Sequence, residues 1–199
     1  CMKKLIIILD PAHGSDVAGK RSPDGLHREY KWSREICADL KVIFEALGYE
    51  VHYTNHLDTE IGLSERRKRA EAIKTDKTKV LLSVHNNAAG DGSKWLNARG
   101  FEIWTRKGFD KADILAELIF QAAKEWFPEI KHRYASDSDC NRDKEGNLYM
   151  TNSNKYLGLL LEWGFQDNKQ DFEILQNKKY NKALADCIVD AVEAFNQTL

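Results

Sequence analysis

Short apolar segments alternate with amphipathic segments along the whole chain. The apolar segments at 3–10, 49–54, 79–85, 100–105 and 156–165 predict strands. The segments at 29–48, 62–74, 110–127, 168–177 and 180–197 predict helices, and in the first of them the apolar positions recur at three- and four-residue steps. Gly48 and Pro128 stand where the first and third of these helices should end.

The order of these elements predicts the fold class. Strands that alternate with helices indicate an α/β domain with a mostly parallel sheet and helices on both faces. We see no internal repeat and no linker, so we expect residues 1–199 to form a single domain. The polar stretch 128–148 has no clear period, and we expect it to surround a cleft or its rim.

Composition narrows the functional classes. The chain has 30 basic and 31 acidic residues, so no global field attracts it to nucleic acid or to an anionic membrane. The basic run 65–69 lies in a predicted helix, where a solvated face is favoured over a phosphate-binding patch. No apolar segment approaches the roughly 20 residues of a membrane span. The run at 5–9 is also shorter than the about 7 residues of a signal peptide's apolar region, so we expect no such leader here.

The four cysteines do not suggest a metal site or a disulfide framework. None has C-x-x-C spacing, and two of them occupy apolar helical positions. We expect Cys1, Cys37, Cys140 and Cys187 to be reduced and not to bind metal.

Polar residues follow three of the predicted strands. His13 comes just after the first strand, His85 ends the third, and Glu162 lies near the end of the last. A single strand-end histidine could simply bond a backbone carbonyl, but parallel neighbouring strands would bring all three side chains to one sheet edge. Glu29, at the start of a helix, is a fourth candidate, although helix capping alone could explain a carboxylate there. Two imidazoles and two carboxylates are what a catalytic zinc site uses.

The motifs that contain these residues resemble a known family, the zinc-dependent N-acetylmuramoyl-L-alanine amidases of the amidase-3 type. The resemblance covers nearly the whole chain and rests on "DPAHGSD", "GLHRE", "LSERRKRAE", "SVHNN" and "EWGFQDN". The last two are the most specific in order and spacing. Glu71 departs from the family's usual asparagine and Asn55 from its common arginine, and neither is a proposed ligand.

The resemblance implies a fold, a site and a reaction. The fold is a single catalytic amidase domain with a twisted six-stranded sheet. The implied ligands of one Zn²⁺ are His13, Glu29 and His85, and Glu162 is the implied catalytic carboxylate. The implied reaction is metal-assisted hydrolysis of the amide between N-acetylmuramic acid and L-alanine in peptidoglycan, with Glu162 passing a proton from water to the leaving amine.

Other residues near these motifs have competing interpretations. His27 is a rival ligand, whereas His52, His56 and His132 are expected in a strand or in polar loops. Asn86 and Asn87 could orient His85, bind substrate or form a turn, and we assign Asn87 to substrate binding. Exposed aromatic rings near the site could stack on substrate or simply pack, and the candidates are Trp95, Trp104 and Trp163.

Other functions and locations stay open from the sequence. A zinc peptidase or deacetylase that acts on another amide is the alternative enzyme, and a wall-binding module with a closed structural metal is the non-enzymatic one. We expect a monomer that acts on the cell wall, in the periplasm or outside the cell. Storage in the cytoplasm as a phage-type lysin would also fit a chain without a signal peptide.

Overall fold

The computed structural model describes residues 3–134 and 142–199. Its strands are β1 (Leu5–Pro11), β2 (Glu50–Tyr53), β3 (Thr78–Asn87), β4 (Phe101–Thr105), β5 (Lys144–Glu145) and β6 (Leu157–Phe165). Its helices are α1 (Glu29–Ala46), α2 (Leu63–Ala72), α3 (Lys111–Trp126), α4 (Lys169–Leu175) and α5 (Lys178–Thr198). Apart from the two-residue β5, each element falls within a few residues of its predicted bounds.

All six strands form one sheet in the order β2-β1-β3-β6-β4-β5. Strands β2, β1, β3 and β6 are mutually parallel, and β4 is antiparallel to β6. The predicted mostly parallel α/β sheet of about six strands is therefore confirmed. β1, β3 and β6 are also neighbours, so their carboxyl ends meet at one edge.

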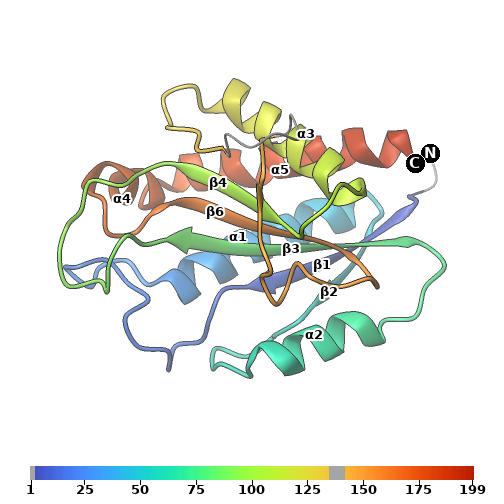
Figure 1. Ribbon diagram of the computed structural model, residues 1–199, viewed down its shortest axis with the longest axis horizontal. Helices are drawn as coiled ribbons and strands as arrows, with labels where there is room; N and C mark the ends of the chain where they lie inside the picture. The colour runs from blue at the N-terminus through green and yellow to red at the C-terminus, as the bar shows by residue number, and fades with distance from the viewer. Residues whose placement is uncertain (1–2, 135–141) are drawn as a thin grey trace.

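Helices cover both faces of the sheet, as Figure 1 shows, with α1, α3 and α5 on one side and α2 on the other. The larger core joins α1, α3 and α5 to alternate strand residues such as Ile7 and Leu82. A smaller cluster joins Ile8 and Leu81, which point the opposite way, to Ala70 of α2. This alternation follows from the strand geometry, in which successive side chains leave opposite faces.

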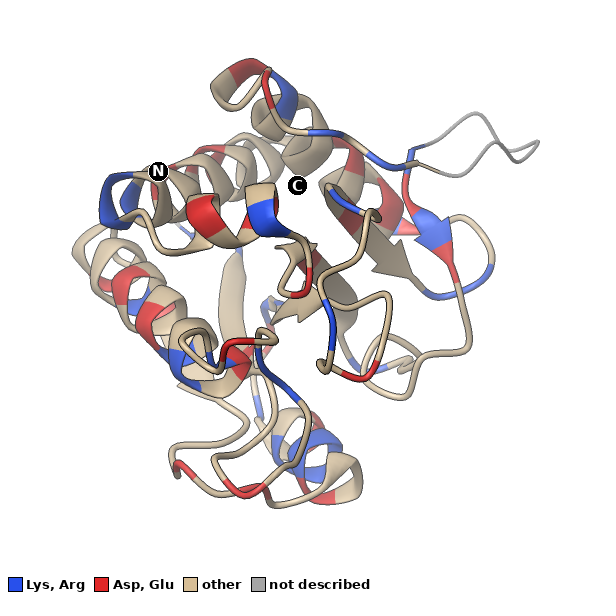
Figure 2. Cartoon of the chain, turned by 90° about the vertical axis from the view of Figure 1, so that its left-hand side faces the viewer, with Lys and Arg blue, Asp and Glu red and all other residues tan. Residues whose placement is uncertain are grey.

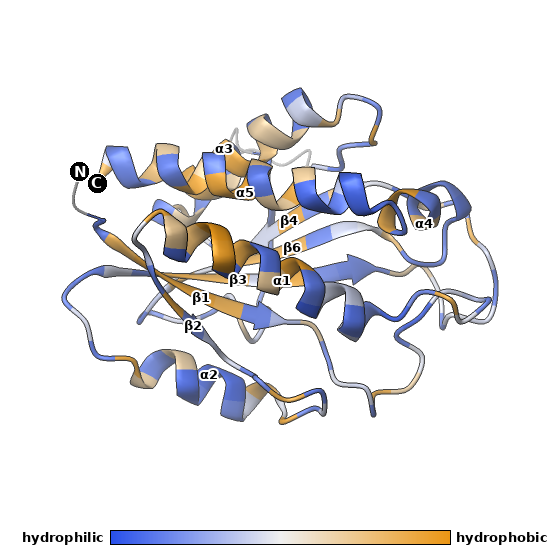
Figure 3. Cartoon of the chain, turned by 180° about the vertical axis from the view of Figure 1, so that it is seen from behind, coloured by the Kyte–Doolittle hydropathy of each residue, from blue (hydrophilic) through white to orange (hydrophobic). Residues whose placement is uncertain are grey.

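At the carboxyl edge of the sheet the apolar residues of the strands are followed by polar residues. Figure 3 shows the orange of β1 and β3 giving way to blue at their arrowheads. Ile6–Leu9 are fully buried apolar residues, whereas the same strand continues into Asp10, and β3 ends on His85, Asn86 and Asn87. The polar strand ends mark this edge as the place for a site.

The structure also describes the surface charge and two of the four cysteines. Lys and Arg are interspersed with Asp and Glu along the helices in Figure 2. Cys37 and Cys187 are free and buried, and Cys1 and Cys140 lie outside the described residues. Among the described helices, none is long and apolar enough to cross a membrane.

Candidate functional site

The predicted site residues lie on or next to three strands and one helix, and they come together at one place in the fold. His85 in β3 pairs in register with Glu162 in β6, and a bulge follows between His85 and Asn87. His13 lies just beyond Pro11, the last residue of β1. Glu29 is the first residue of α1, at the end of the long loop from β1. Residues far apart in the sequence therefore converge at the carboxyl edge of the sheet.

His13, Glu29 and His85 form a cluster that can hold a metal ion. One ligand atom from each residue lies within 4.8 Å of the other two. The two imidazole rings meet edge to face, with centroids 5.0 Å apart. Glu29 Oε1 lies 3.0 Å from His85 Nδ1 and 3.5 Å from His13 Nε2. These donors are the types and the number that a catalytic zinc site takes from protein.

Glu29 is buried and surrounded by donors. Its Oε1 also accepts the backbone N–H of Asn86 at 3.1 Å, and its Oε2 accepts Gln166 Nε2 at 3.0 Å. Burial opposes ionisation, but the hydrogen bonds and charges of His13 and His85 outweigh it and hold the pKa of Glu29 below its ordinary value. The carboxyl is therefore ionised, as a metal ligand must be.

Glu162 differs from Glu29 in having no such support. Its Oε2 is buried without a hydrogen-bond partner among the described residues, although the residue lies beside His85 and opposite Glu102 of β4. Burial, together with the charges of Glu29 and Glu102, raises the pKa of Glu162 to about 7 despite the opposing effect of His85. A carboxyl group with a pKa near neutrality can both accept and donate a proton.

These groups open into a cleft of about 400 Å³. The lining around the cluster is polar and includes Lys20, Asn86, Asn87 and Gln166. A further wall is apolar and consists of Leu63, Leu148, Tyr149, Met150 and Leu160. The predicted rim segment 128–148 contributes Leu148, whereas residues 135–141 lie outside the described part of the chain. The cleft gives the cluster access to a substrate.

Two supporting residues received no firm role from the sequence. Gln166 belongs to the quoted "EWGFQDN" motif, and it contacts Glu29 because the chain turns back after β6. The sequence left several roles open for Asn86. In the structure its side chain donates to Trp163 O at 2.7 Å and contacts His27. Position within a motif was the available signal for both.

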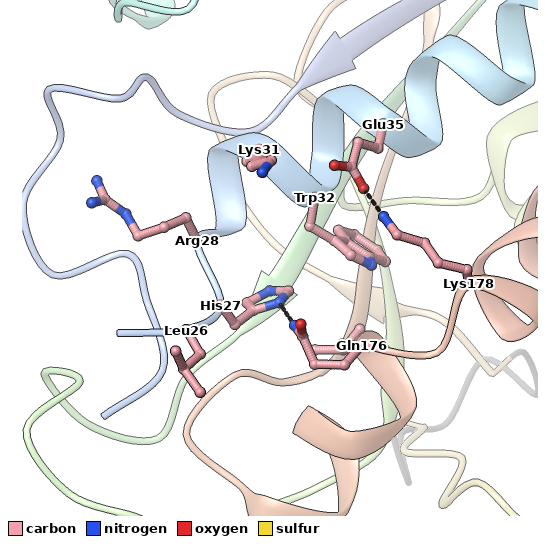
Figure 4. A pocket seen from close by; sticks show the side chains of 9 residues that line it. Leu26, His27, Arg28, Lys31, Trp32, Glu35, Gln176 and Lys178 are labelled. Carbon is pink, nitrogen blue, oxygen red and sulfur yellow. Dashed lines mark hydrogen bonds and ion pairs between the residues drawn. The ribbon is translucent and has the colours of Figure 1, made fainter. Parts of the chain in front are cut away.

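His27 is not part of the cluster. Its Nε2 lies 2.7 Å from Asn86 Oδ1 and its Nδ1 lies 2.9 Å from Gln176 Nε2, so both ring nitrogens have partners. The ring faces a second cavity of about 230 Å³, shown in Figure 4, which shares no lining residue with the cleft. The cations at that cavity include Lys178, which pairs with Glu35. The structure therefore does not bring His27 together with His13, Glu29 and His85.

The aromatic candidates do not line the cleft. Trp163 is 2% exposed and stacks on Phe101 in the core, with centroids 3.8 Å apart, so a stacking role for it is wrong. Trp95 packs edge-on against Phe172, and Trp104 donates to Glu102. Among the described residues that line the cleft, Tyr149 is the only Tyr, Phe or Trp. Its side chain is 45% exposed. The sequence did not single it out.

The other predictions on polar residues have mixed outcomes. Asn87 lines the cleft, and its Oδ1 accepts the N–H of Ala88 at 2.8 Å, so its substrate role stays a prediction. Asn55 ties its own loop together through Leu57 and Thr59. His52 is half-buried on β2 and His56 is exposed in a loop, as expected.

The basic run in α2 is not simply a solvated face. Arg66 is 2% exposed and forms ion pairs with Asp10 and Glu60, so the interpretation is wrong for this residue. Arg69 pairs with Glu65 one turn away on the same helix, and Lys68 is exposed. The helix pattern could not reveal the distant partner Asp10, because β1 precedes α2 by a long stretch of chain.

Comparison with known proteins gives a consistent result. The family model described as N-acetylmuramoyl-L-alanine amidase, of the amidase-3 type, matches residues 7–194. The probable cell wall amidase LytH of Staphylococcus saprophyticus is 25% identical over 195 residues, covering 98% of this chain and 59% of that protein. The N-acetylmuramoyl-L-alanine amidase AmiC of Neisseria meningitidis is 34% identical over 104 residues, or 49% of this chain and 24% of that protein. The chain thus spans about 59% of the length of the LytH relatives.

A solved structure shares the fold. The N-acetylmuramoyl-L-alanine amidase from Clostridium difficile 630 matches with a TM-score of 0.83 at 24% identity, and the match covers 98% of this chain and 97% of that one.

Proposed function

The chain belongs to the N-acetylmuramoyl-L-alanine amidase family, and from this membership we propose that it hydrolyses the amide between N-acetylmuramic acid and L-alanine in peptidoglycan with the help of zinc. The observation that carries the proposal is the cluster of His13, Glu29 and His85 at the mouth of a cleft, with Glu162 beside it. We also propose that the enzyme acts on the cell wall as a monomer.

The donor set fits a catalytic zinc. His13, Glu29 and His85 would hold the ion, and the cleft beside them leaves room for water and substrate. Structural zinc sites are closed by four protein ligands, so an open cluster of three favours an enzyme over a wall-binding module. When bound, zinc would supply a Lewis acid that activates water and polarises the amide carbonyl.

Glu162 would perform the proton transfers. Its free, buried Oε2 can accept a proton from the attacking water and then deliver it to the nitrogen of the leaving L-alanine. Because its pKa of about 7 lies close to neutral pH, neither transfer would be strongly uphill. The products would be a glycan strand and a free stem peptide.

The walls of the cleft would hold the two parts of the substrate. The exposed ring of Tyr149 offers a flat apolar surface for a sugar, and the guanidinium of Arg67 packs over the ring at 5.2 Å from its centroid. Asn87 and Lys20 lie among the polar lining residues, where amide and carboxylate groups of the stem peptide could bind. We therefore propose substrate-binding roles for Asn87 and Tyr149, because both line the cleft.

Digestion of purified sacculi tests the proposal. We expect the zinc-loaded protein to release stem peptides with a free L-alanine amino terminus while glycan chain length stays constant. A peptidase would instead expose amino termini within the stem peptide, and a deacetylase would release acetate. Undiminished hydrolysis after complete removal of metal would exclude the zinc mechanism.

A further inference from the structure

His13 has an unusual backbone conformation. Its φ is 45°, and among the described residues it is the only non-glycine residue with a positive φ. The left-handed region is unfavourable for L-residues with a Cβ, and such strain persists where the surroundings impose it. A candidate metal ligand on a loop therefore sits in a conformation that it would not adopt freely.

Two arginines from opposite faces of the sheet bind the carbonyl oxygens around His13. Arg34 of α1 donates to the carbonyls of Ala12 at 3.0 Å and His13 at 2.9 Å. Arg66 of α2 donates to the carbonyl of His13 at 2.9 Å and also to that of Pro11. The carbonyl of His13 is thus bonded by both guanidinium groups.

Ser33 of α1 binds the backbone N–H of Ala12 in this segment. Its Oγ accepts the N–H of Ala12 at 2.8 Å and donates to the carbonyl of Val84 at 2.6 Å. The segment 11–13 is thereby tied to β3 immediately before His85. Ser33 thus connects the backbone next to His13 with the backbone next to His85.

The arginines are themselves held in place. Arg66 is buried, and it donates to Asp10 Oδ1 at 2.9 Å and to Glu60 Oε1 at 2.9 Å. Arg34 also donates to the carbonyls of Leu57 at 2.8 Å and Tyr30 at 2.9 Å. A planar guanidinium can serve several carbonyls in a fixed geometry, which a lysine ammonium cannot reproduce.

We propose that Arg34 and Arg66 are positioning residues that hold the carbonyls of residues 11–13 and thereby keep His13 in its left-handed conformation, so that its imidazole is already oriented for the metal. This inference rests on the proposed metal function. Without the two guanidinium groups the loop would relax to negative φ and turn the imidazole away. Metal binding would then have to restore the strained turn, and the affinity would fall.

Zinc affinity measured by competition with a chelator tests the proposal. Arg34→Gln and Arg66→Lys should weaken zinc binding by roughly 10- to 100-fold, the range found for residues that orient metal ligands. Lys41→Gln on α1 and Arg69→Gln on α2 are the matched controls and should bind zinc like the wild type, because their side-chain partners lie elsewhere. Folding of each variant is checked by circular dichroism. If Arg66→Lys does not fold, the zinc affinity of Arg34→Gln alone tests the proposal. Wild-type affinity in folded Arg34→Gln would overturn the proposal.

A metal-free measurement separates this inference from the proposed function. His13→Gly and His13→Ala both remove the imidazole, but only alanine keeps the Cβ that is strained at positive φ. In metal-free protein with Arg34 intact, the glycine variant should melt at a higher temperature than the alanine variant. In the Arg34→Gln background that difference should shrink or reverse, since the turn can relax. An unchanged difference contradicts the positioning role, whereas a wild-type protein that binds no zinc contradicts the proposed function.

Discussion

The two carboxylates of the site, Glu29 and Glu162, have opposite environments although both are near His85. Glu29 accepts four contacts, from His13, His85, Asn86 and Gln166, and its pKa is lowered. Glu162 has a buried oxygen that no described residue bonds, and its pKa is raised to about 7. A permanently ionised carboxylate suits a metal ligand, and one that titrates near neutrality suits proton transfer.

The different roles of these carboxylates predict different losses on mutation. Glu29→Ala should lose zinc, and activity should fall with the metal content. Glu162→Gln should retain zinc but lose turnover by roughly 10²- to 10⁴-fold, because the amide cannot accept the proton of water. Zinc content and turnover on a muramyl peptide are measured for each variant, with Glu35→Gln on α1 as a control that should change neither. Loss of metal in Glu162→Gln would show that the roles are assigned wrongly.

The raised pKa of Glu162 also predicts a pH dependence of stability in the metal-free protein. A carboxyl whose pKa is higher in the folded state than its ordinary 4.5 loses stabilising free energy as pH rises through about 7. Glu162→Gln does not titrate, so relative to the wild type it should be more stable at pH 8 than at pH 4. The gain should be a few kcal/mol at most, since one pKa unit corresponds to about 1.4 kcal/mol. Urea denaturation at the two pH values measures it, and an equal stability difference at both would contradict the assignment.

At the scale of elements, β6 both carries Glu162 and supports the apolar wall of the cleft. A Cβ at Gly158 would lie 2.8 Å from Thr151 Cα and 2.9 Å from the carbonyl oxygen of Met150. Both neighbours are backbone atoms of the segment that precedes β6 and lines the cleft. The absence of a side chain at Gly158 therefore lets this wall lie directly on the strand.

Gly158→Ala should accordingly disturb both stability and substrate binding. Overpacking against backbone should lower the free energy of unfolding by about 1–3 kcal/mol. KM should rise because Met150 and Thr151 must move within the cleft, whereas zinc affinity should stay near the wild-type value. Gly108→Ala is the control, since it has positive φ but no neighbouring atom within 4 Å. It should lower stability without raising KM, and an equal rise in KM for both variants would contradict the role of Gly158.

At the scale of the whole molecule, the site joins parts of the fold that are otherwise separate. The larger core lies between the sheet and α1, α3 and α5, and the smaller one lies beneath α2. Glu29 belongs to α1, His85 belongs to the central strand β3, and His13 belongs to a loop that Arg66 of α2 holds. A bound ion would therefore link segments that are held by both cores.

Metal binding should thus stabilise the entire domain. A ligand that binds the folded state alone adds about 2.7 kcal/mol at 100 times its Kd. One zinc per chain should bind, a chelator should lower the melting temperature and abolish activity, and added zinc should restore both. His52→Ala on β2, whose imidazole contacts Glu50, should behave like the wild type. A melting temperature that does not respond to zinc would argue against a site of this kind.

The sequence by itself determined the fold class and the residues at the centre of the site. β1, β3 and β6 are buried runs long enough to be recognised, and parallel neighbouring strands must bring their carboxyl ends together. His13, His85 and Glu162 were therefore expected to share an edge if the three strands were neighbours, and the strand order in the structure meets that condition. Family motifs supplied Glu29, which capping alone could have explained.

Only the tertiary structure decided which other residues serve the site. The two-residue β5 is too short to leave a periodic pattern, and the antiparallel direction of β4 has no local signature. Trp163 and Glu162 are consecutive, yet the pleat sends one into the core and the other toward the cleft. The burial of Arg66 likewise arises from contacts between segments distant in sequence. Periodicity reports the path of the backbone within one element, whereas a side chain's role depends on what the other elements place against it.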